Sequence, residues 1–100
     1  MSVTVTVEWQ AKPGNGATMR QAILEVLPET RSYKGCQWLE LVVNQDDPNN
    51  FIVWERWDTR ANYEAYLKWR VDKGVVSSLG SLAVKDRPNI RFYDTVKEFP

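Results

Sequence analysis

The chain has 100 residues, with 13 Lys and Arg, 13 Asp and Glu, no histidine and a single cysteine, Cys36. The balanced charge, without a basic run, gives no indication of nucleic-acid binding, and no apolar segment approaches the roughly 18 residues that a membrane span needs. A lone cysteine allows no internal disulfide, and the alternating start does not resemble a signal peptide. We therefore expect one cytoplasmic domain over residues 1–100, with no nucleic-acid or membrane partner.

The first predicted elements are a strand and a helix. Residues 3–9 alternate apolar and polar side chains, and this period of two is typical of a strand. The Pro-Gly-Asn-Gly stretch at 13–16 ends it. From Ala17 to about Thr30 the apolar residues recur at helical spacing, which predicts a helix with one buried face. Pro28 lies in its last turn, so we expect the helix to end or bend early there.

Two β-rich segments come next. Residues 36–44 and 51–57 predict an antiparallel hairpin, with the turn at Asp-Pro-Asn-Asn, 47–50. The neighbouring Asp46 and Asp47 are explained by that turn. Because histidine is absent and cysteine nearly so, we expect no metal site.

The last third of the chain predicts two helical pieces and a strand. Thr59 is a suitable N-cap for a helix from Arg60 to about Trp69. A second piece over 71–82 is weakened by its two glycines, and residues 90–96 form the final strand.

The order β-α-β-β-α-β is that of the ferredoxin-like α+β fold, a four-stranded antiparallel sheet with helices on one face. The alternation divides the strand residues between two faces, but a shift of one residue would exchange the faces of a strand. Under either register both faces carry large apolar side chains, so we expect a homodimer that covers the open face. The helix side is assigned Val3, Val5, Val7, Trp9, Leu39, Leu41 and Val43, and the open side Trp38, Val42, Phe51, Val53, Trp57 and Tyr93, mixed with polar residues that include Glu55.

Several short motifs carry a resemblance over nearly the whole chain. Lys12-Pro13-Gly14 precedes the first helix, Gly35 precedes the second strand, and Glu55-Arg56-Trp57-Asp58-Thr59 leads into a helix that contains Tyr63 and Tyr66. In this order and spacing the chain resembles the antibiotic biosynthesis monooxygenase family of small dimeric α+β barrels. The resemblance implies a homodimer and one of three activities: cofactor-free oxygenation, quinol oxidation or haem degradation.

The resemblance argues against haem. The family's haem degraders use an asparagine, a tryptophan and a histidine where this chain has Val7, Tyr66 and Val76. Because no histidine is available to bind iron, we expect no haem and no other cofactor. The missing histidine also weakens any histidine-dependent quinone chemistry.

Cofactor-free oxygenation of a phenolic, anthrone or quinol-like molecule requires a site that binds a ring, takes a proton, stabilises the anion and excludes water. Glu55 is the candidate base, if its surroundings raise its pKa, and the same side chain could instead form an ion pair. Trp57 and Tyr66 are candidate donors, or they fill the core. The full set of candidates is Trp57, Tyr66 and Glu55 as catalytic residues and Tyr63, Trp9 and Trp38 as binding residues for a small aromatic substrate.

Two other functions compete with an oxygenase. A non-catalytic protein that binds small molecules would use the same scaffold and the same aromatic walls. RNA-recognition modules share the element order, but they carry glycine and aromatic residues on the third strand. Here that strand reads Phe-Ile-Val-Trp-Glu-Arg-Trp, with a central glutamate, so we do not expect RNA binding.

Overall fold

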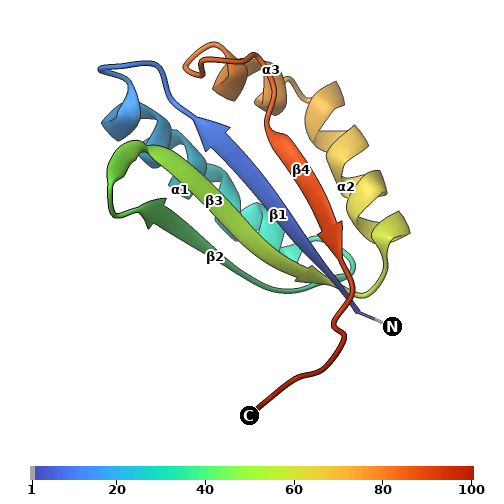
Figure 1. Cartoon of the computed structure of the whole chain (residues 1–100). Coiled ribbons are helices and arrows are strands. Elements are labelled where there is room, and N and C mark those ends of the chain that lie inside the picture. The colour runs from blue at the N-terminus through green and yellow to red at the C-terminus, as the bar shows by residue number, and fades with distance from the viewer. Residues whose placement is uncertain (1) are drawn as a thin grey trace.

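The computed structural model describes residues 2–100 and contains one sheet covered by helices on one side (Figure 1). The strands form an antiparallel sheet in the order β2-β3-β1-β4, which confirms the predicted ferredoxin-like α+β fold. No helix among residues 2–100 has both the length and the apolar character to span a membrane. The elements are β1 (Val3–Gln10), α1 (Gly16–Ser32), β2 (Cys36–Asn44), β3 (Asp47–Trp57), α2 (Arg60–Asp72), α3 (Val75–Gly80) and β4 (Asn89–Tyr93).

Helix α1 continues past its proline, so the first of the two effects expected of Pro28, an early end of the helix, was wrong. The helix runs to Ser32, and Pro28 lies inside it, one turn before its end. Side chains support this turn, because the carbonyl oxygen of Val26 accepts hydrogen bonds from the Thr30 hydroxyl at 3.2 Å and from Arg70 Nη2 at 2.8 Å. Tertiary contacts therefore stabilise a turn that a proline would otherwise weaken.

The hairpin turn is shorter than predicted. Asn44 pairs with Asp47, so the turn is Gln45-Asp46, and the expected turn at 47–50 was wrong. The Asn44 side chain stabilises the turn by accepting a hydrogen bond from the Asp46 amide at 2.9 Å. Pro48 lies inside β3 beside an irregularity in the β2–β3 pairing, a place where a residue without an N–H is tolerated.

Helix α2 begins where the sequence predicts, whereas the second helical piece is shorter than the expected 71–82 and spans Val75–Gly80. The Thr59 hydroxyl accepts a hydrogen bond from the Asn62 amide at 3.0 Å, which confirms the N-cap of α2. Helix α2 extends to Asp72, and Gly74 then adopts φ 80°. This left-handed conformation suits glycine, and it separates α2 from the short helix α3.

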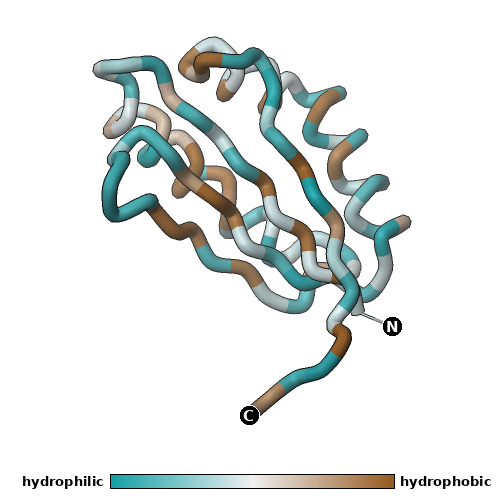
Figure 2. Tube along the Cα trace, viewed as in Figure 1, coloured by the Kyte–Doolittle hydropathy of each residue, from teal (hydrophilic) through white to brown (hydrophobic). Residues whose placement is uncertain are grey.

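The face assignment of β3 was wrong by one residue. Glu55 pairs with Val5, and Trp57 pairs with Val3, so this set of β3 residues shares the helix side with the valines of β1. Figure 2 shows the alternation of hydropathy along the strands. In β3 both alternating sets contain a large aromatic and one charged residue, so the pattern does not identify the buried set. The helix side holds Phe51, Val53, Glu55 and Trp57, and the open side holds Ile52, Trp54 and Arg56.

Candidate functional site

A small cavity of about 60 Å³ lies between the sheet and the three helices. Its walls are mostly apolar, and this volume holds a few water molecules, since one water needs roughly 10–15 Å³ on the same measure. Glu55 and Arg70 are the charged side chains among its lining residues. The lining also includes Trp9 from β1, Tyr63 and Tyr66 from α2, and Val76 from α3.

Glu55 projects from β3 into this apolar layer. Its side chain is almost entirely buried, with 3% of the residue exposed, and its direct neighbours across the sheet are Val5 and Leu39. Burial raises the pKa of Glu55 to about 7, and a hydrogen bond from Trp57 opposes the rise. Near neutral pH this carboxyl group is therefore able both to take up and to release a proton.

Trp57 holds Glu55 in place. The indole Nε1–H of Trp57 donates to Glu55 Oε1 at 2.7 Å, and Trp57 itself is fully buried. The one hydrogen bond found at this carboxyl group among residues 2–100 is to Oε1, and since no fully enclosed side-chain oxygen among these residues lacks a partner, Oε2 is an accessible atom. Because Glu55 lines the cavity, this second oxygen is available to a molecule bound there.

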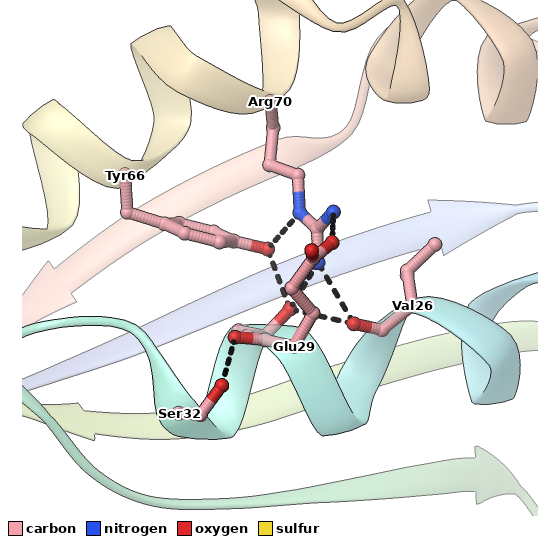
Figure 3. A network of polar contacts seen from close by, with 6 residues as sticks. Val26, Glu29, Ser32, Tyr66 and Arg70 are labelled. Carbon is pink, nitrogen blue, oxygen red and sulfur yellow. Dashed lines mark hydrogen bonds and ion pairs between the residues drawn. The ribbon is translucent and has the colours of Figure 1, made fainter.

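The hydroxyl of Tyr66 belongs to a polar network between α1 and α2 (Figure 3). It lies 2.6 Å from Thr30 Oγ1 and accepts a hydrogen bond from Arg70 Nε at 2.9 Å. Arg70 also donates to Thr30 Oγ1 at 3.1 Å and to Glu29 at 2.8 Å. Because Thr30 donates its own proton to the Val26 carbonyl, Tyr66 is the donor to Thr30. Its single proton is thus used inside the protein.

The Tyr63 hydroxyl is free by comparison. Tyr63 is 1% exposed and lines the cavity, and no hydrogen bond to its hydroxyl is found among residues 2–100. Because no fully enclosed side-chain oxygen or nitrogen among these residues lacks a partner, the hydroxyl is an accessible atom. Burial raises the pKa of Tyr63 far above its ordinary value, and the charge of Glu55 adds to the rise. The pKa of Tyr66 is also raised by burial, although Thr30 and Arg70 oppose it. Both phenols therefore stay protonated, but Tyr63 is the one able to donate to a ligand.

The structure brings most of the predicted site residues to this cavity. Trp9, Glu55, Tyr63 and Tyr66 line it. Trp57 lies outside the lining and contacts Glu55 instead. Trp38 is on the open side of the sheet, where it is 45% exposed, and the cavity does not include it.

The sequence interpretation missed Arg70 and Thr30. Arg70 is 4% exposed, and a signal for it was present, because Tyr63, Tyr66, Leu67 and Arg70 follow the spacing of one buried helical face. Val7, Tyr66 and Val76, the positions that depart from the haem-degrading pattern, all line the cavity. Among residues 2–100, no three His, Cys, Asp or Glu side chains are grouped to hold a metal ion.

Comparisons with known proteins agree on the fold. A protein-family model described as antibiotic biosynthesis monooxygenase matches residues 2–70, whereas no curated protein sequence matches the chain. The crystal structure of an antibiotic biosynthesis monooxygenase has a TM-score of 0.83 and 21% identity, covering 95% of this chain and 99% of that chain. SnoaB, a cofactor-independent oxygenase from Streptomyces nogalater, has a TM-score of 0.83 and 13% identity over 99% and 97% of the two chains. A protein from Methanosarcina mazei Go1 has a TM-score of 0.81 and 17% identity over 93% and 91%.

Proposed function

Since the chain belongs to the antibiotic biosynthesis monooxygenase family, we propose that it is a cofactor-independent monooxygenase that oxidises a phenolic, anthrone or quinol-like aromatic molecule with O₂. The observation that carries the proposal is Glu55, a buried carboxyl group with a pKa of about 7 on the wall of an apolar cavity. A base of this kind is suited to a weakly acidic O–H or C–H group at neutral pH. The cofactor-independent oxygenase among the structural neighbours is in accord with the same chemistry.

Anthrone illustrates the reaction. Glu55 accepts a proton from the acidic CH₂ group. The resulting anion places its charge on the oxygen of the former carbonyl group, where Tyr63 donates a hydrogen bond. The anion transfers electrons to O₂, and a C–O bond forms at the deprotonated carbon. Loss of the remaining proton on that carbon, with cleavage of the O–O bond, yields anthraquinone and one water. All four electrons that reduce O₂ come from the substrate, so the balance requires no cofactor.

In this proposal the remaining candidates position the base or the helices. Trp57 donates to Glu55 rather than to the substrate. Tyr66 joins α2 to α1 through Thr30 and Arg70, and Trp9 forms part of the cavity wall.

We also propose the homodimer expected from the sequence, formed by the open faces of two sheets. The open face of one chain exposes several large apolar side chains, an arrangement that favours association. Trp38 belongs to this interface in the proposal, and the cytoplasmic location stays a prediction. The exposed set is Trp38, Val42, Trp54 and Tyr93.

The test is O₂ uptake by the purified protein with anthrone, 1,4-dihydroxynaphthalene and hydroquinone. We expect saturable uptake, a loss on the order of 10²–10⁴ in kcat/KM for Glu55→Gln, and a loss on the order of 10² for Tyr63→Phe. Tyr66→Phe removes the same atom from the neighbouring tyrosine and should change kcat/KM far less. Uptake no faster than the background reaction, together with tight anaerobic binding of these compounds, would support the non-catalytic small-molecule-binding protein instead.

A further inference from the structure

Val76 separates two hollows of the molecule. It lines the inner cavity that contains Glu55, and it also lines a wider pocket of about 570 Å³ on the other side of α3. The rim of this outer pocket is formed by exposed side chains that include Lys12, Val71 and Asp86. The outer pocket is therefore accessible from the solvent, and Val76 forms part of the wall behind it.

The inner cavity is too small for the proposed substrates. Sites for drug-sized molecules occupy roughly 300–1,000 Å³, whereas the inner cavity measures about 60 Å³. The outer pocket falls within the required range at about 570 Å³. A ring system that reaches Glu55 therefore needs more space than the inner cavity holds, and the outer pocket adjoins that cavity at Val76.

The two ends of α3 are held differently. At the C-terminal end, the Leu82 carbonyl accepts a hydrogen bond from the Lys12 amide at 2.9 Å, and the Val84 amide donates to Gln10 at 2.8 Å, so this segment is fixed to the end of β1. The N-terminal end follows Gly74, and its backbone hydrogen bonds are local: the Gly74 amide donates to the Val71 carbonyl at 3.0 Å, and the Ser78 amide donates to the Gly74 carbonyl at 2.9 Å. The half-buried Val76 thus lies on the half of this six-residue helix whose backbone hydrogen bonds are local.

We propose that aromatic substrates reach Glu55 from the outer pocket past Val76, and that the side chain at position 76 sets the largest ring system admitted. This inference rests on the proposed function. The polar rim near Lys12 and Asp86 suits hydrogen-bonding substituents on the ring that remains in the outer pocket. The apolar wall at Val76 suits the ring that enters the inner cavity. The substrate class is accordingly a phenol or anthrone of two or three fused rings with a polar outer end.

The experiment compares Val76→Ala, Val76→Phe and Ser78→Phe with the wild type. Ser78 is an exposed residue of the same helix that lines neither hollow, so Ser78→Phe controls for a bulky side chain on α3. We expect Val76→Ala to raise kcat/KM for anthrone relative to hydroquinone by on the order of tenfold, and Val76→Phe to lower the same ratio by a similar factor. Ser78→Phe should leave the ratio unchanged.

Anaerobic binding of anthrone and hydroquinone, followed by stopped-flow tryptophan fluorescence, separates this inference from the proposed function. If Val76→Phe slows anthrone binding but Ser78→Phe does not, the access route is supported even without turnover. Equal binding rates and affinities in both variants would overturn it, whether or not O₂ is consumed. Absence of binding to the wild type would overturn it as well. If Val76→Phe fails to fold, the same binding measurement is made on Val76→Ala, which should bind anthrone faster than the wild type.

Discussion

The two faces of the sheet use the same kinds of side chain for different purposes. On β3, Trp54 faces the open side and is 43% exposed, whereas Trp57 faces the helices and is fully buried. The charged residues alternate in the same way, with Arg56 on the open side and Glu55 on the helix side. The difference shows that the layer covering a strand decides the chemistry of its side chains, more than the composition of the strand does.

The covering layer acts by removing water. On the helix side, burial raises the pKa of Glu55 to about 7 and produces a proton acceptor suited to neutral pH. The open side has no such layer in a single chain, so its aromatic side chains remain available for association.

The largest expected effect on association or stability is on the open face. Trp54→Glu places a charge where we propose that two sheets meet, and it should raise the dissociation constant of the dimer by on the order of a thousandfold, about 4 kcal/mol. Light scattering over a range of protein concentrations measures this change. Val96→Glu introduces the same charge at a fully exposed residue beyond β4 and should leave association unchanged. A wild-type protein that is monomeric at every concentration would contradict the proposed dimer.

Glu55→Gln tests the helix face through stability. The folded-state pKa of about 7 lies above the ordinary value of 4.5, so folding favours the protonated carboxyl. This contribution is fully present below about pH 4.5 and is lost as the pH rises through 7. The wild type should lose about 3 kcal/mol of unfolding free energy over this interval on account of Glu55, and Glu55→Gln should remove that part of the loss.

Urea unfolding at pH 4.5 and pH 8 measures the difference. Glu40→Gln is the matched variant, because Glu40 is an exposed carboxylate on the open face that pairs with Trp54. Glu40→Gln should retain the pH dependence of the unfolding free energy that arises from Glu55 in the wild type. The assignment of a raised pKa to Glu55 would be wrong if Glu55→Gln and the wild type lost stability in parallel.

The comparison of faces also shows how far the sequence alone could lead. Periodicity and capping predicted the order of the elements, because the valines of β1 and the Thr59 cap have only one reasonable interpretation. The pattern over Phe51–Trp57 has two, since either alternating set can be buried. Only the strand pairing resolves this, because Glu55 lies beside Val5.

The candidate site was predictable in its residues but not in their roles. Glu55, Tyr63 and Tyr66 could be named from type and position, and the cavity contains all three. Sequence could not show that the Tyr66 hydroxyl is hydrogen-bonded to Thr30 and Arg70 while the Tyr63 hydroxyl has no such partner. Such assignments depend on side-chain contacts between residues about 40 positions apart, which local patterns do not encode.

Arg70→Met tests how the covering layer is held over the helix face. The substitution keeps an apolar stem but removes the donors to Tyr66, Thr30, Glu29 and the Val26 carbonyl. We expect a loss of about 2 kcal/mol of unfolding free energy, measured by urea titration, since these bonds are partly replaced by water. Glu29→Gln should cost at most about 1 kcal/mol, because Glu29 is 61% exposed. If both variants lost the same unfolding free energy, the stabilisation would come from the ion pair between Arg70 and Glu29 and not from the other hydrogen bonds of Arg70.

The smallest expected effect sharpens the contrast between the two tryptophans of β3. Trp57→Phe keeps an aromatic ring but removes the Nε1–H that donates to Glu55 Oε1. Because this hydrogen bond lowers the pKa of Glu55 against the effect of burial, its loss should raise that pKa further. The acidic limb of the kcat/KM profile should then move to higher pH, with activity at pH 7 reduced by at most about tenfold. Trp54→Phe makes the same change on the open face and should leave the limb in place. A limb that moved to lower pH in Trp57→Phe, or that moved equally in both variants, would mean that Trp57 does not tune the base.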